Sequence, residues 1–551
     1  MSHHRALDYD YPKIRFFIQE QEMIEYVLID QIQEAFDQFN RGQKYLYSTL
    51  TTTIKDNQTN DEYLIRLFNE LHDHVDLFEQ MNEQFLDFLQ FQIDWTKQSK
   101  AVLDAFSHFQ ITVISSNIKH AERYLSFLFT LFTVPENSIH DFAHDTLQRL
   151  MFTVPLASTL LCPIAERYFP FMTKDKHIQV LYVENLLRSL NYLPIERLKF
   201  FEIILTKLLR MDVHASRQDI LRTEERHVEN EMVFTLEQSD DRMKHEQADK
   251  LDWLMFILFE YITKVSHKDG KFQYKQTELL LKDFLNIFNK FLSPTHDSSH
   301  VQFLIFYICS FHRDFSDEFM NNCWKTFVSP SISMTFRQAA IYYLCSFIAR
   351  ANYIKIKSVL TLTQSMVDWL HMYMSTTETD TCRTNPKRHI PFYAICQAVL
   401  YIFIYRHQEI ARLSNGIERV FQWRLNHVIS SKLNPLKFCL PAITLQFAQL
   451  ARNYQIAFCY SIIETNRRYS LPEMFSFDNY SSIVPSQILH AYFPFDPYVL
   501  KRSSIFIRPI YNEYQDESED FNRADTNENE NILQSLMMST TPSSLHSIDG
   551  V

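Results

Sequence analysis

Glycine is scarce in this chain, which has four glycines among 551 residues: Gly42, Gly270, Gly416 and Gly550. Glycine provides the positive φ angles of tight turns and lets the backbone approach a phosphate closely. The Gly-rich loops of dinucleotide-binding folds and of P-loop nucleotidases are therefore absent. Two-residue β-hairpins, which depend on glycine, are nearly excluded as well. This scarcity favours a helical chain over a β-rich one.

An excess of basic residues is also missing. The formal net charge is −12 and the sequence pI is about 6.0. Proteins that bind DNA on their own usually carry a basic face or a pI above about 9. We therefore expect weak or no direct DNA binding, with a partner making most of any phosphate contacts.

The chain lacks CxxC pairs and long apolar runs. Its eight cysteines mostly lie within apolar segments, which is typical of reduced thiols in a core. The longest apolar stretch, residues 390–405, is interrupted by Gln397 and is too short for a membrane span. We expect a buried helix there and no membrane partner. The polar N-terminus predicts no signal peptide.

Helical periodicity dominates from about residue 60 onward. Apolar residues recur at i, i+3, i+4 and i+7, as in Val183, Leu186, Leu187 and Leu190. This spacing places each set on one helix face. Prolines separate such segments at intervals that suit helix pairs of on the order of forty residues, the HEAT or armadillo length. We predict an all-α, HEAT/armadillo-like helical repeat solenoid.

Three segments organise this prediction. Residues 1–60 form an N-terminal helical and polar segment, and residues 61–512 form the HEAT-like helical repeat domain. Residues 513–551 form an acidic, Ser/Thr-rich tail whose composition is typical of disorder. Within the repeat domain, residues 219–249 are acidic and mostly polar, which predicts an inserted, solvated loop. Deleting residues 222–247 should then leave thermal stability nearly intact.

Patterns that carry chemistry are few. His140 and His144 stand at i and i+4 with Asp141 between them, which imitates a metalloprotease motif. A shorter Asp in place of Glu and the lack of a third ligand favour ordinary helix-surface histidines. No nucleophile elbow or cysteine-protease signature is present. We assign no catalytic residue, metal or cofactor, and the chain is predicted to be an interaction protein rather than an enzyme.

Serines and threonines are the remaining candidates for exposed sites. Ser115, Ser116, Ser138 and Ser158 lie near the predicted ends of N-terminal helices. They could cap helices or form turns, and they could form a docking surface that phosphate would disrupt. Residues expected to be accessible to phosphorylation follow a basic pair or precede a proline; they are Ser503, Ser504 and Thr541.

Several blocks in the last two-thirds of the chain closely resemble the RNA polymerase I-specific transcription initiation factor family, the TIF-IA type. The most distinctive are DVHASRQ at 212–218, PTHDSSHVQF at 294–303 and FPFDPYVLKR at 493–502. Shorter blocks are FRQAA at 336–340, SFIARA at 346–351, LNPLK at 433–437, FCYSIIE at 458–464 and RPIY at 508–511. The family-motif residues are Arg337, Gln338, Arg350, Asn434, Pro435, Phe493, Pro494, Phe495, Asp496, Pro497, Lys501, Arg502 and Arg508.

The resemblance implies a solenoid of HEAT-like helix pairs that works in the nucleus and nucleolus. It implies binding to RNA polymerase I near the stalk and dock surfaces, contact with the promoter-bound selectivity factor, and self-association when free. It also implies control by kinases, partly through a serine surface in the N-terminal half. Residues 493–502 are expected to lock the C-terminal end of the solenoid. Arg350, Lys355 and Lys357 form a modest basic cluster that could touch nucleic acid, but a solvated helix end is the favoured interpretation. The alternatives are a HEAT-type transport or scaffold adaptor and a metal-dependent enzyme.

Overall fold

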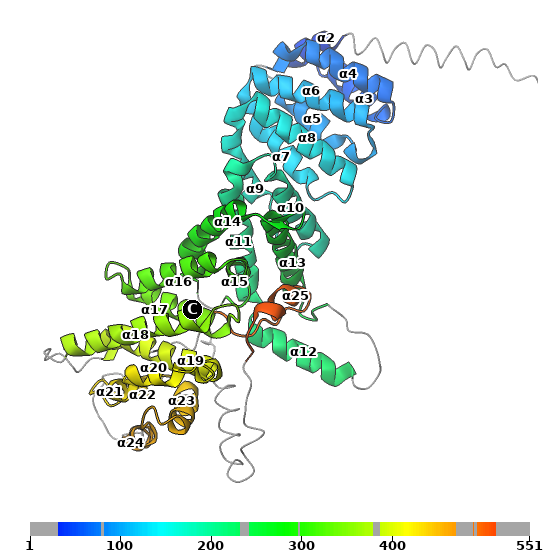
Figure 1. The fold of residues 1–551 in the computed structure, drawn as a ribbon. Helices are drawn as coiled ribbons and strands as arrows, with labels where there is room; N and C mark the ends of the chain where they lie inside the picture. Colours follow the sequence, from blue (N-terminus) through cyan, green and yellow to red (C-terminus); the bar gives the residue numbers. More distant parts are fainter. Residues whose placement is uncertain are drawn as a thin grey trace, which may run out of the picture. The chain divides into compact units, whose positions relative to one another are not determined.

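The computed structural model of the chain describes residues 31–78, 82–231, 242–295, 298–377, 386–469, 489 and 493–513. Nearly all of the expected tail, including Thr541, lies outside these residues. The described structure is almost wholly helical, which confirms the all-α helical-repeat prediction (Figure 1). Its strands, β1 (His267–Lys268) and β2 (Lys271–Phe272), pair in an antiparallel hairpin. The chain divides into two compact units between Ile204 and Leu205.

The first unit is built from ten helices and five short 3₁₀ turns in its described part, the last helix continuing into the second unit. The helices are α2 (Ile32–Asn40), α3 (Tyr45–Asp56), α4 (Asp61–Asp73), α5 (Glu83–Gln92), α6 (Lys100–Ser116), α7 (Ala121–Leu131), α8 (Asn137–Thr153), α9 (Leu161–Arg167), α10 (Lys176–Ser189) and α11 (Arg197–His214). The 3₁₀ turns are η1 (Val75–Phe78), η2 (Trp95–Lys97), η3 (Ile118–His120), η4 (Pro155–Leu160) and η5 (Pro194–Glu196). Helix α6 packs against both α4 and α8, as successive layers of a helical repeat do.

Aromatic side chains fill the core of this unit. Trp95 stacks on Phe106 of α6 with 4.0 Å between ring centroids, and Phe36 of α2 packs edge-on against Phe85 of α5 at 5.0 Å. Such ring pairs add to the free energy gained by burying their area. Because Phe36 also contacts Phe78, the described part of residues 1–60 belongs to the same core as the helices after it. The expected boundary at residue 60 therefore does not coincide with the division of the structure.

The second unit contains the remaining helices. They are α12 (Arg217–Glu231), α13 (Glu246–Ser266), α14 (Tyr274–Ile287), α15 (Phe303–Ser310), α16 (Arg313–Val328), α17 (Met334–Arg350), α18 (Ile356–Thr377), α19 (Ile390–Ala411), α20 (Gly416–Gln422), α21 (Leu425–Ile429), α22 (Pro435–Phe438), α23 (Pro441–Asn453), α24 (Tyr460–Tyr469) and α25 (Ser504–Ile507). The unit also contains a π turn, η6 (Phe288–Leu292), and two 3₁₀ turns, η7 (Pro386–His389) and η9 (Arg508–Ile510).

Two inner helices form the centre of the second unit. Every residue from Gln338 to Arg350 in α17 and from Pro391 to Ile404 in α19 is buried. A helix that is apolar on all faces must be covered on all faces, and α17 packs against both α16 and α19. The apolar stretch at residues 390–405 is thus a buried helix, as predicted. No helix in the described part of the chain is long and apolar enough to cross a membrane.

The prediction of a solvated loop at residues 219–249 is wrong at both ends. Helix α12 continues to Glu231, and α13 begins at Glu246. Ser216 caps α12: its Oγ accepts the Asp219 N–H at 3.2 Å and donates to Asp219 Oδ2 at 2.6 Å. Asp219 in the first turn of α12, and Glu246 and Asp249 in the first turn of α13, therefore lie where the helix dipole favours negative charge. Residues 232–241 lie outside the described structure.

Candidate functional site

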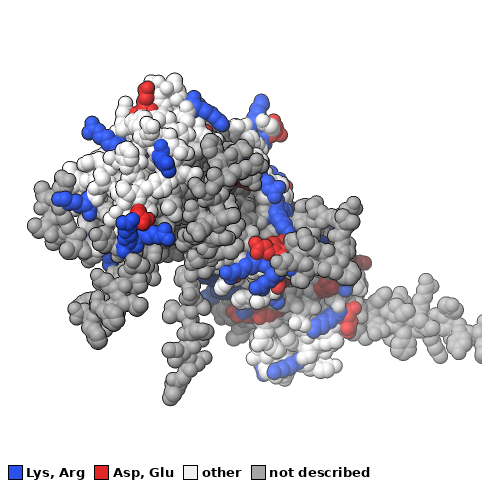
Figure 2. All heavy atoms as spheres, turned by 90° about the horizontal axis from the view of Figure 1, so that it is seen from below, with Lys and Arg blue, Asp and Glu red and all other residues white. Residues whose placement is uncertain are grey.

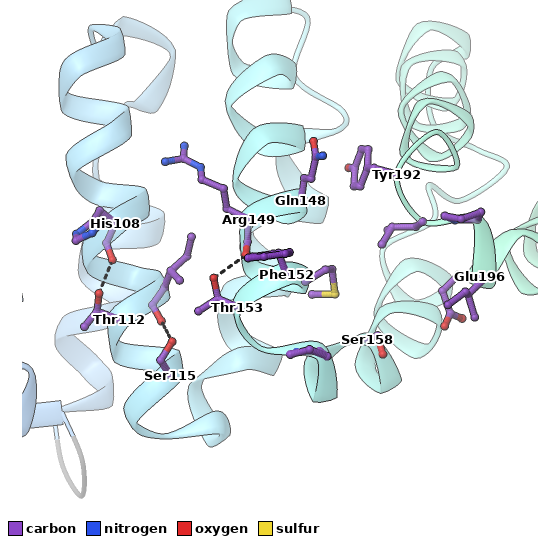
Figure 3. Close-up of a pocket in the computed structure, with 16 residues that line it drawn as sticks. His108, Thr112, Ser115, Gln148, Arg149, Phe152, Thr153, Ser158, Tyr192 and Glu196 are labelled. Atoms are coloured by element: carbon purple, nitrogen blue, oxygen red, sulfur yellow. Dashed lines mark hydrogen bonds between the residues drawn. The ribbon is translucent and has the colours of Figure 1, made fainter.

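An open groove of about 820 Å³ lies on the first unit (Figure 3). It runs between the C-terminal halves of α6 and α8, the turn η4 and the segment just before α11. Its lining residues are His108, Ile111, Thr112, Ser115, Gln148, Arg149, Met151, Phe152, Thr153, Pro155, Ser158, Tyr192, Leu193, Pro194, Ile195 and Glu196. All of them belong to the first unit, so the groove is formed within one compact body.

Hydroxyl groups occupy the ends of the two helices that border the groove. Ser115 Oγ donates to the Ile111 carbonyl at 2.8 Å, and Thr153 Oγ1 donates to the Arg149 carbonyl at 2.9 Å (Figure 3). Each hydroxyl thus donates its hydrogen bond to the preceding helical turn. Its oxygen can still accept a hydrogen bond from a partner. The rim of the groove can accept hydrogen bonds without unfolding either helix end.

Apolar side chains are exposed beside these hydroxyls. Phe152 and Ile195 in the groove wall are both 89% exposed, and Leu156 in η4 is 64% exposed. The helix α8 ends at Thr153 because Pro155 disfavours the helical conformation of the residue before it. Phe152 therefore lies in the last turn of α8, where no further helical turn covers its side chain. Contiguous exposed apolar residues rimmed by polar groups mark interaction sites.

The charged side chains of the groove have partners within the chain. Arg149 pairs with Asp104 at 3.2 Å, and Glu196 pairs with Lys199 at 2.9 Å. Glu196 also accepts a hydrogen bond from the thiol of Cys162 at 3.3 Å. Burial, reinforced by Glu196, raises the pKa of that thiol to about 12, so it stays protonated and is a poor nucleophile. The groove therefore offers apolar contacts and hydrogen bonds, and it offers little net charge.

The structure gathers only part of the predicted serine surface. Ser115 and Ser158 line the groove together, and Ser116 is exposed on the next position of α6. Ser138 lies at the opposite end of α8 from the groove, about 20 Å along the helix at 1.5 Å per residue. Phe152 and Ile195 were not predicted as site residues, because an isolated aromatic or aliphatic residue in a helical segment is more typical of a core.

The two histidines of the metal-like motif are buried, and their interpretation as helix-surface residues is wrong. His144 Nδ1 contacts the Tyr192 hydroxyl at 2.7 Å, and Nε2 contacts Asn185 Oδ1 at 3.0 Å. Burial lowers the pKa of His144 to about 4, which keeps the ring neutral. Both ring nitrogens are thus engaged in tying α8 to α10 and to Tyr192 in the groove wall. The described residues contain no group of three side chains that could hold a metal ion.

The family-motif block packs across the middle of the second unit. Residues 493–513, here called the C-terminal clamp, contact α12, α13, α15, α17 and α19. Asp496 lies 3.6 Å from Arg217 and 3.6 Å from Arg350, and Phe495 donates its N–H to Ser346 Oγ at 2.9 Å. Lys501 Nζ donates to Glu224 Oε2 at 2.6 Å. The clamp thus joins helices far apart in sequence, whereas the sequence predicts a lock at the C-terminal end.

Four further motif residues of the clamp are held by specific contacts. The Pro494 carbonyl accepts a hydrogen bond from Gln302 at 2.6 Å, and the Pro497 carbonyl accepts one from Arg217 at 3.1 Å. The guanidinium of Arg502 lies 3.8 Å from the centroid of the Trp253 ring. Phe493 stacks on Tyr401 of α19 at 4.1 Å, and Arg508 is exposed in η9.

The motif residues outside the clamp also make structural contacts. Arg337 donates to the Phe327 carbonyl at 2.6 Å, and Gln338 donates to the Tyr342 hydroxyl at 2.9 Å. Asn434, with a positive φ of 46°, precedes Pro435 at the first position of α22.

Burial corrects three sequence interpretations in and beside the clamp. Ser503 is 0% exposed and Ser504 is 3% exposed, so neither is accessible to a kinase in the folded chain. Arg350 is 4% exposed, lies 4.3 Å from the Tyr405 ring centroid and donates to the Asn512 carbonyl at 3.4 Å. It is therefore an internal anchor, whereas Lys355 and Lys357 are exposed as expected.

The helices and the groove described above define the chain as an all-α protein of the helical-repeat class. Residues 21–519 match the family described as RNA polymerase I specific transcription initiation factor RRN3. The chain belongs to this family.

Related proteins agree with this assignment. The chain is 31% identical over 531 residues to the RNA polymerase I-specific transcription initiation factor RRN3 of Mus musculus, covering 88% of this chain and 81% of the mouse protein. It is 27% identical to the corresponding factor of Schizosaccharomyces pombe, over 76% of this chain and 75% of that protein. A crystal structure of RNA polymerase I transcription initiation factor Rrn3 has the same fold, with a TM-score of 0.71, 21% identity, and coverage of 89% of this chain and 99% of that one. These relatives are initiation factors and not enzymes.

Proposed function

We propose that the chain binds RNA polymerase I through the groove of the first unit and makes the polymerase competent to initiate on ribosomal RNA genes. The observation that carries the proposal is the grouping of Ser115, Ser158 and the exposed Phe152 and Ile195 around one groove. Membership of the family supplies the identity of the polymerase. The partner surface is expected to be apolar and rich in hydrogen-bond donors, because the groove has little net charge.

Phosphorylation of Ser115 or Ser116 is proposed to weaken this contact. Both residues end α6, where the last carbonyls give the helix a partial negative charge. A phosphate adds about −1.5 to −2 charges, which is unfavourable at that end and demands hydration inside an apolar interface. Ser138 is the second residue of α8, where the same charge would be favourable. Phosphorylation is thus expected to be unfavourable at Ser115 or Ser116 and favourable at Ser138.

Contact with the promoter-bound selectivity factor is assigned to a surface other than the groove, so that the chain bridges two partners. A helical repeat suits this task because its elements present separate surfaces. Action on ribosomal RNA genes implies a nuclear location, and we propose the nucleolus within it. We also propose that the free chain self-associates by covering Phe152 and Ile195, which polymerase binding would prevent.

The test is a pull-down of purified RNA polymerases I, II and III with the full chain and four variants. Phe152→Ser and Ser115→Asp should each lower retention of polymerase I at least about tenfold, since a buried interface aromatic and a desolvated charge are each worth more than about 1.4 kcal/mol. Ser138→Asp is the matched control for charge, and Phe171→Ser is the control for an exposed aromatic outside the groove. Both controls should bind normally.

Selective retention of polymerase I that depends on Phe152 would support the groove as the contact site. Selective retention that is equal for all variants would keep the function and move the contact elsewhere. Equal retention of all three polymerases, or of none, would instead favour the adaptor hypothesis.

A further inference from the structure

Charge is distributed unevenly along the chain. Residues 351–469 contain 14 Lys and Arg residues against 6 Asp and Glu residues, a net charge of +8 in a chain of net −12. In the described part of this range, Arg406 is buried, Lys437 is half-buried and the other eleven basic residues are exposed. An acidic protein thus carries a basic surface in one part of its second unit, which whole-chain pI conceals.

The fold gathers part of this charge over α20 to α24. Asn434 and Asn466 exchange side-chain hydrogen bonds of 2.6 and 3.1 Å, which ties α22 to α24 and brings Lys432 and Lys437 near Arg467. The Asn426 side chain accepts the Phe458 N–H at 3.3 Å and joins the α21 region to the segment before α24. We define the basic surface as the exposed or half-exposed residues Arg419, Arg424, Lys432, Lys437, Arg452 and Arg467.

Of the three acidic residues within 406–469, Glu418 is exposed on α20 beside Arg419, and the other two pair with basic residues outside this surface. Glu464 pairs with Arg468 at 3.2 Å, and Glu409 pairs with the buried Arg406 at 3.3 Å. On the face drawn in Figure 2, the part formed by these helices shows blue side chains among uncharged ones, with few red side chains. A surface of one sign attracts an oppositely charged ligand over roughly a Debye length, about 8–10 Å at ordinary salt.

The chain carries its own acidic counterpart directly after the C-terminal clamp. Residues 513–530 contain eight Asp and Glu residues and one Arg, a net charge of −7. The segment starts beside α17, because Asn512 donates its N–H to the Arg350 carbonyl at 2.6 Å. Helix α17 packs on α19, and α19 packs on α20, α22 and α23. Helix α19 therefore packs both on the helix beside the start of the segment and on three helices of the basic surface.

Chain length permits the contact. Seventeen residues beyond Glu513 span up to about 55–60 Å when extended. As a flexible coil they have a root-mean-square reach of about 20–25 Å. A tethered segment of this length acts at an effective concentration in the millimolar range. Weak ion pairs can then give substantial occupancy without a tight intrinsic affinity.

We propose that residues 513–530 bind in cis to the basic surface of α20 to α24 and cover it until a partner with a stronger negative field displaces them. The basic surface is thus a binding site for acidic peptides, and in the free protein the chain's own residues 513–530 occupy it. Both the segment and the basic surface belong to the second unit, so their contact is independent of the polymerase contact proposed for the first unit.

The test measures binding of a fluorescent synthetic peptide of residues 513–531 to full-length protein. A tail-neutral variant replaces Asp516, Glu517, Glu519, Asp520 and Asp525 by the corresponding amides. The peptide should bind this variant at about 50 mM salt at least tenfold more tightly than it binds the native chain, whose own segment competes in cis. Binding should fall steeply at about 300 mM salt, because exposed charge pairs are screened.

Charge reversal locates the site. Lys432→Glu combined with Arg467→Glu in the tail-neutral chain should abolish peptide binding, while Lys275→Glu combined with Lys325→Glu, on α14 and α16, should leave it unchanged. Equal binding to native and tail-neutral chains, no binding to either, or insensitivity to the Lys432 and Arg467 reversal would each overturn the proposal. Binding of a single-stranded oligonucleotide but not of the peptide would also overturn it and assign the surface to nucleic acid.

Discussion

The carboxylate of Asp252 in α13 accepts the backbone N–H of Ser503 at 2.8 Å, although 251 residues separate them in the chain. The same carboxylate accepts the N–H of Arg502 at 2.8 Å and the hydroxyl of Ser503. Asp252 is almost completely buried, and burial raises its pKa above the ordinary value while these three donors oppose the rise. The C-terminal clamp is thus anchored to α13 by one side chain that satisfies three donors.

Replacing Asp252 by Ala should destabilise the clamp strongly. The substitution leaves the N–H groups of Arg502 and Ser503 without their acceptor, and a buried unsatisfied donor costs about 1–3 kcal/mol. We expect a loss of about 3 kcal/mol or more in the free energy of clamp opening, measured by hydrogen exchange of residues 493–513. Glu260→Ala, which removes a carboxylate that pairs with Lys264 further along α13, is the control for losing a carboxylate from this helix. Unchanged exchange in Asp252→Ala would show that the clamp is held elsewhere.

The same geometry predicts that Ser503→Glu is disruptive. A carboxylate facing the buried Asp252 carboxylate would pair like charges in a region of low dielectric constant. The variant should therefore expose the clamp to proteolysis near residue 500, whereas Thr541→Glu should not change cleavage there. Phosphate found on Ser503 in folded, protease-resistant protein would contradict the buried position.

Arg350 should not tolerate replacement by Lys. Its guanidinium lies 4.3 Å from the Tyr405 ring centroid and 5.3 Å from the Tyr511 ring centroid, and it reaches Asp496 at 3.6 Å. A planar group can stack and donate at once, which an ammonium cannot do. We expect Arg350→Lys to lower the free energy of unfolding of the second unit by about 1–3 kcal/mol in denaturant titration. Arg508→Lys, at an exposed position of the same block, should change it by less than about 0.5 kcal/mol.

His144 predicts a pH dependence in the first unit. Its folded-state pKa of about 4 is lower than the ordinary value near 6.5, so the unfolded chain takes up the proton first as the pH falls. The stabilisation by neutral His144 is therefore complete above about pH 6.5 and is lost progressively towards pH 4. The loss is on the order of 2–3 kcal/mol. Burial also lowers the pKa of His140, which acts in the same direction.

The measurement is hydrogen exchange of α8 and α10 at pH 7, 6 and 5, corrected for the intrinsic rate. Native protein should lose protection in these helices as the pH falls. His144→Gln should be less protected at pH 7 and should show a smaller pH slope, because Gln does not titrate. His177→Gln, at an exposed position on α10, should retain the native slope. Equal slopes in all three proteins would remove His144 as the cause.

Local patterns predict the helices well and the sites poorly, for a physical reason. The apolar run at residues 390–405 determines its own burial, because no exposed helix could carry it, and α19 is buried as expected. The burial of Ser503 and Arg350 depends on partners 251 and 162 residues away, so neighbouring residues give no signal of it. For Phe152 the error is the opposite one. Its neighbours in sequence predict a core residue, but α8 ends beside it and leaves its side chain exposed.

The acidic segment gives the last prediction, and the structure reverses the expectation drawn from composition. Deleting residues 222–247 would remove Glu224, which accepts hydrogen bonds from Lys501 Nζ at 2.6 Å and from the Lys244 N–H at 2.6 Å. It would also remove the first turn of α13, where the His245 side chain accepts the Ala248 N–H. Loss of a helix cap costs about 1 kcal/mol, and loss of a partly exposed ion pair costs up to about 1 kcal/mol. We therefore expect a lower melting temperature for this deletion, with increased hydrogen exchange in the clamp around Lys501.

Glu224→Gln should reproduce part of this increase in exchange, and Glu225→Gln, whose side chain is exposed, should not. A deletion variant with native stability would show that neither contact matters in solution and would restore the solvated-loop interpretation.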